Sequence, residues 1–242
     1  MAYYRRPLQL MEQYNDIQGH AIYDYWKTGK AASLKVHNSY GVPEKMPVRS
    51  FFKSYQELPE IERFALDICE EEILDVGAGA GRHALILQEM QKKVTALEMS
   101  PLSAEVMRQR GVKEVIEQDL FCFENYKFMT ILMLMNGIGL SGTIQGLENM
   151  LEYMKGLLHP EGQWIFDSSD ISYLYAKGKK PKDYYYGEIK YQFEYKRLKG
   201  SWFNWLYIDK KKLTQLAKKS GWHCQVIYEN DQDEFLTRLT LS

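Results

Sequence analysis

The chain has 242 residues, of which 45% are hydrophobic and 26% charged, and its formal net charge is -1. Length and composition are those of a globular protein with one large domain, or one domain and a cap, and they allow a sizeable core. A net charge so close to zero gives no argument for a nucleic acid or an acidic membrane as partner. No run of about 18 apolar residues is present, so no membrane span is expected.

Cysteine usage and the first residues bear on the compartment. Cys69, Cys122 and Cys224 lie far apart and are odd in number. This pattern predicts reduced thiols in a cytoplasmic protein and neither a disulfide framework nor a metal site. The basic pair Arg5-Arg6 is followed by no apolar segment, so a signal peptide is not expected.

Residues 1–70 are expected to form a helical cap or lid. Apolar and aromatic side chains recur every three or four positions up to Tyr25, which predicts an amphipathic helix that ends at Gly29. Residues 30–50 contain two prolines and are expected to form a loop. A second amphipathic helix is predicted to start at Pro59.

A glycine-rich turn follows a short apolar strand at residues 73–76, and helix-forming residues follow the turn. Gly77, Gly79 and Gly81 occupy alternate positions after Asp75. Glycine is needed where the backbone takes left-handed angles and lies close against a ligand. A strand that leads into such a turn and a helix N-terminus is typical of sites for nucleotide-like ligands, although a turn without a ligand is the alternative.

The spacing of the glycines distinguishes two cofactors. The dinucleotide fingerprint G-x-G-x-x-G, counted from Gly77, requires glycine at position 82, where the chain has Arg82. The observed Asp-x-Gly-x-Gly-x-Gly instead resembles motif I of the class I S-adenosylmethionine (SAM)-dependent methyltransferases. An NAD-dependent oxidoreductase is therefore the less favoured alternative.

Glu98 ends the next predicted strand, residues 93–98, seventeen residues after Gly81. In doubly wound folds an acidic residue about 20 residues beyond the turn binds the ribose hydroxyls, and a carboxylate can accept both hydrogen bonds. A solvated strand end is the alternative for Glu98. Ser100 and Pro101 are expected to cap the helix that follows.

A third strand is predicted over residues 115–121, with Asp119 near its end. The resemblance implies that Asp119 accepts a hydrogen bond from the adenine amino group and that Leu120 and Phe121 pack on the ring. A turn aspartate beside a core phenylalanine is the alternative.

The almost uniformly apolar residues 128–135 predict a strand buried on both faces of a parallel sheet. The resemblance places the methyl-transfer pocket directly after this strand, at Asn136-Gly137. An amphipathic helix, a turn at residues 159–162 and a fifth strand at residues 163–167 are expected next. Alternation of strand and helix predicts a parallel sheet built from βαβ units.

Beyond the fifth strand the alternation ends. An inserted β-hairpin is predicted at about 184–208, then a helix capped by Asp209, and finally two strands. The predicted fold is α/β: a doubly wound, Rossmann-like, seven-stranded, mostly parallel sheet with an antiparallel last strand. Residues 1–70 form the expected cap, and residues 71–242 the SAM-binding domain that carries the hairpin.

Three further segments resemble a narrower group of uncharacterised bacterial methyltransferases, over most of the chain. They are Gly81–Leu85, Met135–Leu140 and Asp167–Asp170. The Asn-Pro-Pro-Tyr signature of amino-directed DNA and protein methyltransferases is absent after the fourth strand. That absence argues against methylation of DNA bases.

The resemblance implies SAM as the cofactor, S-adenosylhomocysteine (SAH) as the product, no metal, and a set of site residues. Cofactor contacts are expected from Asp75, Gly77, Ala78, Gly79, Gly81, Arg82, His83, Glu98, Met99, Ser100, Asp119, Leu120, Phe121, Met135, Asn136 and Gly137. Substrate contacts are expected from Tyr14, Tyr25, Asp167, Ser168 and Asp170. Core packing is the alternative for the two tyrosines, and a simple turn is the alternative for the other three.

No general base is assigned by the sequence. His83 is a candidate, with helix capping or a surface position as the alternative, and Asn136 is a candidate for orienting the nucleophile. Asp75 either fixes the glycine-rich turn or binds the SAM ammonium through water. Because SAM is already activated, alignment and desolvation can suffice without a base.

The favoured function is methyl transfer to a small molecule. A catalytically silent SAM-binding or assembly protein with the same fold is the main alternative. An RNA methyltransferase is less favoured, because the lysines and aromatics of the C-terminal third are explained by a solvated charged face. No membrane partner is expected, and a homodimer is left open.

Overall fold

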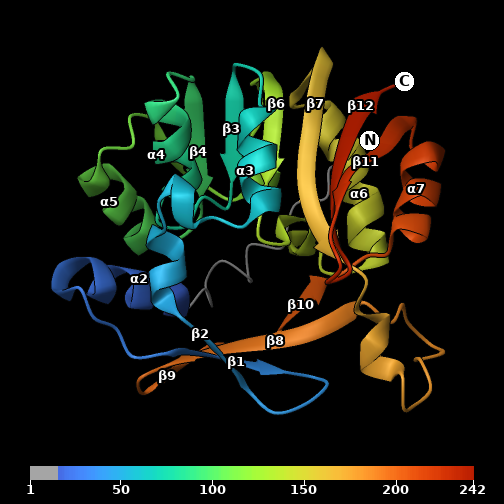
Figure 1. Ribbon diagram of the computed structural model, residues 1–242, viewed down its shortest axis with the longest axis horizontal. Coiled ribbons are helices and arrows are strands. Elements are labelled where there is room, and N and C mark those ends of the chain that lie inside the picture. Colours follow the sequence, from blue (N-terminus) through green and yellow to red (C-terminus); the bar gives the residue numbers. More distant parts are fainter. Residues whose placement is uncertain (1–15) are drawn as a thin grey trace. The chain divides into compact units, whose positions relative to one another are not determined.

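A computed structural model describes residues 16–242 (Figure 1). The chain forms two compact units. The first contains the described residues up to Leu58, together with Leu74–Glu124 and Tyr191–Phe203. The second contains Pro59–Ile73, Asn125–Lys190 and Asn204–Ser242. No helix of these described residues is long and apolar enough to cross a lipid bilayer.

Seven strands form the larger sheet. They are β3 (Ile73–Val76), β4 (Val94–Glu98), β5 (Val115–Glu117), β6 (Phe128–Met133), β7 (Leu158–Ser169), β11 (Trp222–Glu229) and β12 (Glu234–Leu241). Their order is β11-β12-β7-β6-β3-β4-β5. β4 with β5 and β6 with β7 pair in parallel, whereas β12 is antiparallel to both of its neighbours. The predicted α/β fold with a mostly parallel seven-stranded sheet is confirmed.

The helices begin and end close to the capping residues that the sequence indicates. They are α2 (Ile17–Thr28), α3 (Glu60–Asp67), α4 (Arg82–Glu89), α5 (Pro101–Arg110), α6 (Ile144–Lys155) and α7 (Lys210–Lys219). The side chains of Ser100 and Asp209 each accept a hydrogen bond from the backbone N–H three residues later. Gly29 and Gly111 end α2 and α5 in the left-handed conformation.

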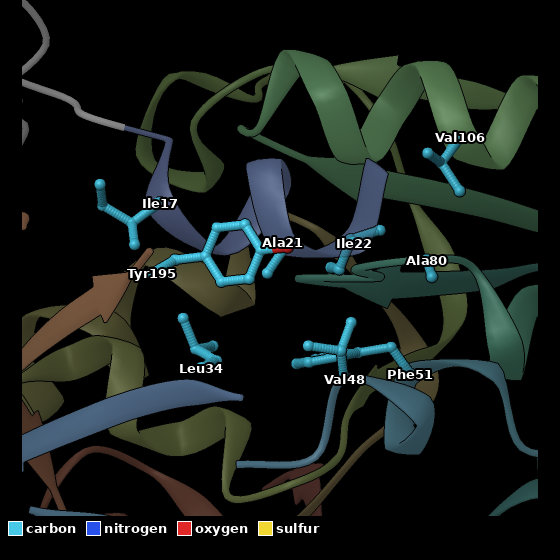
Figure 2. Packing of buried hydrophobic residues seen from close by; sticks show 9 residues of the cluster. All are labelled: Ile17, Ala21, Ile22, Leu34, Val48, Phe51, Ala80, Val106 and Tyr195. Atoms are coloured by element: carbon cyan, nitrogen blue, oxygen red, sulfur yellow. The ribbon is translucent and has the colours of Figure 1, made fainter. Parts of the chain in front are cut away.

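The first unit has a core cluster to which α2 contributes Ile17, Ala21 and Ile22 (Figure 2). Figure 2 shows the Tyr195 ring, from β8 (Glu188–Tyr195), beside these side chains. Burial of such side chains stabilises the unit by roughly 1.5–3 kcal/mol for each large aliphatic group. The regularly spaced apolar side chains that predict α2 therefore pack this helix into the core of the unit.

Residues 30–50 are not a loop, so this prediction is wrong. β1 (Leu34–Asn38) pairs antiparallel with β2 (Glu44–Met46), and a 3₁₀ turn, η1 (Val48–Phe52), follows. Leu34 and Val36 are buried and Lys35 between them is exposed, which is the alternation of a half-buried strand. The two prolines of this segment lie at residues 43 and 47, outside both strands.

The structure contains a second sheet, which the sequence did not predict. Its order is β10-β8-β1-β2, with β10 at Phe203–Leu206, and β9 (Leu198–Lys199) also pairs with β8. β1 lies antiparallel to β8, with Val36 opposite Phe193 (Figure 1). The strands expected within residues 184–208 therefore exist, but one of their partners comes from the N-terminal part of the chain. The hairpin itself stays a prediction.

Three predicted boundaries are corrected by the structure. β5 ends at Glu117 instead of reaching residue 121, because Asp119 caps a short 3₁₀ turn, η3 (Leu120–Cys122). β6 ends at Met133 and not at residue 135. Residues 159–162 do not separate two elements; they are an irregularity inside β7, at the register shift opposite β6.

Gly81 offers a direct test of the local packing that supports the glycine-rich turn. It has φ +76°, and a Cβ there would lie 2.8 Å from both Met107 Cγ and Val112 Cγ2. We expect Gly81→Ala to lower the free energy of unfolding by about 2–4 kcal/mol, from left-handed strain and overpacking together. Chemical denaturation measures the change. Gly178→Ala, at an exposed glycine with open space around it, is the matched control and should change stability by less than about 0.5 kcal/mol. Equal effects of the two substitutions would refute the packing account.

Candidate functional site

The glycine-rich turn lies in the first unit, directly after β3. Gly77, Gly79 and Gly81 have φ of 69°, 57° and 76°, a region that favours glycine. The backbone N–H groups of Gly77 and Ala78 both donate to the Leu97 carbonyl oxygen, at 2.9 and 3.2 Å. The turn is thus held against the C-terminal end of β4.

Glu98 ends β4 and connects the turn to helix α5. Its Oε2 accepts the Gly79 N–H at 2.8 Å, and its Oε1 accepts the Ser100 N–H at 2.9 Å. Burial raises the pKa of Glu98, these backbone N–H groups oppose that effect, and the nearby Asp16 carboxylate adds to it. Each carboxylate oxygen can accept a further hydrogen bond, so Glu98 remains able to bind hydroxyl groups.

Asp16 was not identified from the sequence. Its carboxylate caps α2 by accepting the Gly19 N–H at 2.9 Å, and both of its oxygens lie 2.8 Å from the Ser100 hydroxyl that donates to it. Helix α2 is thereby tied to the N-terminus of α5, next to Glu98. The N-cap pattern of Asp16 was readable in the sequence, but its contact with a residue 84 positions away was not.

Asp75, Arg82 and His83 form a buried polar group beside the turn. Their side chains are 1%, 4% and 5% exposed. Arg82 donates from Nε to His83 Nε2 at 3.2 Å and from its guanidinium to the Ser50 carbonyl oxygen at 2.6 Å. Burial raises the pKa of Asp75 more than His83 and Arg82 lower it, and Asp75 Oδ2 is enclosed without a hydrogen-bond partner.

This geometry bears on His83 as a candidate base. Because its Nε2 accepts from Arg82, the proton of the neutral ring belongs on Nδ1. His83 is buried and in contact with a guanidinium, so the surface alternative does not apply. The contacts favour a structural role for His83 at the start of α4.

Asp119 lies just beyond β5, whose Glu117 pairs with Glu98 of β4. The Gln118 N–H donates to the Glu98 carbonyl oxygen at 3.0 Å, so Asp119 follows directly after this link. Asp119 Oδ1 accepts the Phe121 N–H at 2.9 Å. Asp75, Glu98 and Asp119 thus lie at the C-terminal ends of three neighbouring strands, β3, β4 and β5, as the sequence predicts.

Tyr25 belongs to the same unit, and its ring packs against Phe52 with centroids 4.8 Å apart. Tyr14, the other tyrosine expected to contact substrate, lies outside the described residues. Leu120 and Phe121 are buried, with 6% and 9% of their surface exposed.

The other predicted site residues lie in the second unit. Met135 and Asn136 follow β6 with φ of 62° and 56°, and a Cβ at Gly137 would come within 2.9 Å of Met133 Cβ. The Asn136 backbone N–H donates to Asp167 Oδ2 at 2.8 Å, and its side-chain Nδ2 donates to the Leu206 carbonyl oxygen at 3.2 Å. The end of β6 is thereby joined to the end of β7.

Two oxygen atoms at this junction lack partners. Asn136 Oδ1 and Asp167 Oδ1 are both enclosed by protein and accept no hydrogen bond. Burial raises the pKa of Asp167 to about 7, with further contributions from the charges of Glu62 and Glu234, although the Asn136 N–H opposes the shift. Asp167 is therefore a carboxyl group that exchanges a proton near neutral pH.

Ser168 Oγ and Asp170 Oδ1 each accept a hydrogen bond, unlike Asp167 Oδ1. The fully buried Ser168 hydroxyl accepts the Ile208 N–H at 3.1 Å. Asp170 Oδ1 accepts from the Ser172 N–H at 2.9 Å and from the Tyr186 hydroxyl at 2.8 Å. The Asp170 contact supports the turn-forming alternative, because Asp170 caps the 3₁₀ turn η5 (Ile171–Tyr175), whereas Ser168 lies within strand β7 and not in a turn.

The chain can also be compared with proteins of known sequence and structure. No family model matches the chain, and no curated protein matches it. A crystal structure of a SAM-dependent methyltransferase from Bacteroides fragilis, in complex with SAH, is 41% identical. That match covers 94% of this chain and 95% of the other, with a TM-score of 0.87.

Two more distant structures share the fold alone. The CcbJ methyltransferase from Streptomyces caelestis is 12% identical over 78% of this chain and 99% of its own, with a TM-score of 0.57. The glycopeptide N-methyltransferase MtfA is 16% identical over 76% of this chain and 93% of its own, with a TM-score of 0.52. The identity and coverage of the Bacteroides fragilis match are those of a true relative, and with them the chain is shown to belong to the SAM-dependent methyltransferases.

Proposed function

We propose that this chain transfers a methyl group from SAM to a small-molecule acceptor. The observation that carries the proposal is the Glu98 carboxylate, whose two oxygens accept the N–H groups of Gly79 and Ser100. The arrangement supports Glu98 as the acceptor for ribose hydroxyls, because it lies beside a turn that has left-handed glycines. The residues therefore fit the adenosyl and amino-acid parts of the cofactor, which is SAM, with SAH as the product.

In this proposal, the three acidic residues at the strand ends serve different parts of the cofactor. Glu98 accepts the ribose hydroxyls, and Asp119 accepts from the adenine amino group while Leu120 and Phe121 pack beside the ring. Asp75 supports the turn, and its unpartnered Oδ2 is an acceptor for the ammonium group or an ordered water.

When bound, SAM supplies a sulfonium methyl group: the acceptor's heteroatom bonds to the methyl carbon, the electron pair of the broken C–S bond stays on sulfur, and the acceptor's proton is released. The described residues contain no cluster of three or more side chains arranged to hold a metal ion. In this proposal, residues of the chain align the acceptor with the methyl group, and no residue is assigned as its general base.

A small acceptor is favoured over RNA by the contacts of the tyrosine-rich segment. The Tyr185 and Tyr186 hydroxyls both donate to Asp209, and Lys180 lies over the Tyr186 ring at 3.8 Å. These rings are engaged within the unit instead of forming a free stacking surface. The cap formed by residues 1–70, the SAM-binding domain of residues 71–242 and a cytoplasmic location remain part of the proposal.

Incubation with labelled SAM and a metabolite extract tests the activity. We expect the purified protein to move the labelled methyl group into a low-molecular-weight product, because an active enzyme needs only its acceptor. Chromatography with scintillation counting measures it. Heat-denatured protein is the control. SAM binding by calorimetry without transfer into metabolites or RNA would favour the silent binding protein instead.

Glu98→Gln tests the ribose assignment. The amide keeps the side chain's size but presents an NH₂ group to one of the two backbone donors and loses the charge. We expect SAM binding to weaken by about 1–3 kcal/mol, measured by calorimetry. The matched control is Glu117→Gln, because Glu117 is exposed at the paired position of β5 and bonds Arg108 at 3.3 Å. A folded Glu98→Gln protein with unchanged affinity would refute the assignment.

A further inference from the structure

The 3₁₀ turn η1 packs against the glycine-rich turn within the first unit. A Cβ at Gly79 would lie 3.4 Å from Phe51 Cδ1, so the Phe51 ring lies directly beside Gly79. Phe51 and Ala80 also belong to the buried cluster that Figure 2 shows. The Ser50 carbonyl oxygen accepts the Arg82 guanidinium at 2.6 Å. η1 therefore contacts both the turn and the start of the helix that follows it.

Arg110, the last residue of α5, contacts the glycine-rich turn and the end of η1 together. Its guanidinium donates a hydrogen bond to the Ala80 carbonyl oxygen, and its Cζ lies 4.9 Å from the centroid of the Phe52 ring. A guanidinium over an aromatic face is attracted by the ring's quadrupole. The Phe52 ring also packs against Tyr25 of α2. These contacts form a continuous chain from α2 through Phe52 and Arg110 to Ala80.

The charge of Arg110 is held in place without an ion pair to a described acidic residue. Arg110 is half-buried, and burial lowers the pKa of its guanidinium with no carboxylate acting against that effect. Removing a charge from water is costly when no opposite charge is near. Arg108 of the same helix is exposed instead and donates to Glu117 at 3.3 Å. The contacts that hold the Arg110 guanidinium are therefore the Phe52 ring and the Ala80 carbonyl.

Ala80 occupies a special place in the hydrogen bonding of the turn. The turn's other backbone N–H groups donate within the protein; they belong to Gly77, Ala78, Gly79 and Gly81. The Ala80 N–H takes no part in these bonds. The peptide plane before it is held where Gly79 donates to Glu98, and the plane after it is held where Arg110 donates to the Ala80 carbonyl. Because the backbone has only two soft dihedrals per residue, fixing both flanking planes restricts the direction of the Ala80 N–H.

We propose that Arg110 and Phe52 are positioning residues for the cofactor: together they hold the peptide after Ala80 in the orientation in which the glycine-rich turn binds SAM. Neither residue is assigned a contact with the cofactor or a part in the chemistry. The inference rests on the cofactor of the proposed function and concerns its binding alone. It gives Tyr25 the role of supporting the Phe52 ring, in place of the predicted contact with substrate.

Arg110→Met tests the proposal by binding, without any turnover. Methionine keeps an unbranched apolar chain beside Phe52 but donates no hydrogen bond to the Ala80 carbonyl. We expect the Kd for SAH, measured by calorimetry in the absence of an acceptor, to rise roughly tenfold, because a charge-assisted hydrogen bond that orients the turn is lost. Arg110→Lys keeps the charge and a donor without the planar guanidinium, and its Kd should rise less, roughly threefold.

The matched control is Arg108→Met, the same substitution at an exposed position of the same helix. We expect this protein to bind SAH as the wild type does. Chemical denaturation of each variant shows that it is folded at the temperature of the titrations. A folded Arg110→Met protein with wild-type affinity for SAH would overturn the proposal, and so would an equal loss of affinity in Arg108→Met.

The amide nitrogen of Gly81 gives a spectroscopic signature of the contact. Its NMR chemical shift responds to hydrogen bonding at the carbonyl of the preceding residue, which is Ala80. In the cofactor-free protein we expect Arg110→Met to move the Gly81 nitrogen resonance and Arg108→Met to leave it at its wild-type position. An unmoved resonance in Arg110→Met would show that Arg110 does not orient the Ala80 carbonyl, and it would overturn the proposal even if the affinity for SAH fell.

A double-mutant cycle tests whether Phe52 acts through Arg110. Phe52→Leu removes the aromatic face but keeps an apolar side chain, and we expect it to raise the Kd for SAH roughly threefold. Because the two residues are in contact, the protein with both Arg110→Met and Phe52→Leu should bind SAH about as Arg110→Met alone does. Fully additive losses would overturn the shared role. A wild-type protein that binds SAH but transfers no methyl group would refute the proposed function and leave these binding tests unaffected.

Discussion

The hydrogen bond from the Gly79 N–H to Glu98 Oε2 is the interaction on which the first unit's candidate site depends. This bond requires a left-handed backbone at Gly79. The other oxygen of Glu98 accepts the backbone N–H of Ser100, the residue that caps helix α5. The hydroxyl group of Ser100 donates to the carboxylate of Asp16, the residue that caps helix α2, and so connects α2 to α5. A single carboxylate thus fixes the turn, a helix start and, through Ser100, the N-terminal helix.

Local signals made most of this unit predictable. Caps such as Ser100 and Gly111 act through neighbouring residues, so helix α5 could be located from the sequence to within its first and last residue. The acids at the ends of β3, β4 and β5 could be expected to converge because parallel strands present their C-terminal ends at one edge. β1 was also readable from the alternation of Leu34, Lys35 and Val36, and the prolines that follow led to the wrong loop assignment.

The remaining features depend on contacts between residues distant in the chain, for which a single sequence carries no signal. The pairing of Val36 with Phe193 joins positions that lie 157 residues apart, and nothing in the sequence of either segment predicts the other as its partner. The left-handed Met135 and Asn136 were also hidden, because their apolar neighbours resemble the continuation of a strand. Asn136 and Asp167 could each be singled out as strand-end residues, but their direct hydrogen bond and the two unpartnered oxygens emerge only from the folded structure.

Glu98 and Asp167 show how one functional group is directed to two kinds of chemistry. Both are carboxyl groups whose pKa is raised by burial. Both oxygens of Glu98 accept backbone N–H groups, which oppose the effect of burial on its pKa, and each oxygen can accept a further hydrogen bond from a hydroxyl group. Asp167 has an unpartnered oxygen and two nearby glutamates, so its ionised form is poorly supported. The two carboxyl groups therefore differ in their hydrogen bonds: Glu98 is held by backbone donors on both oxygens, whereas Asp167 has one oxygen without a donor.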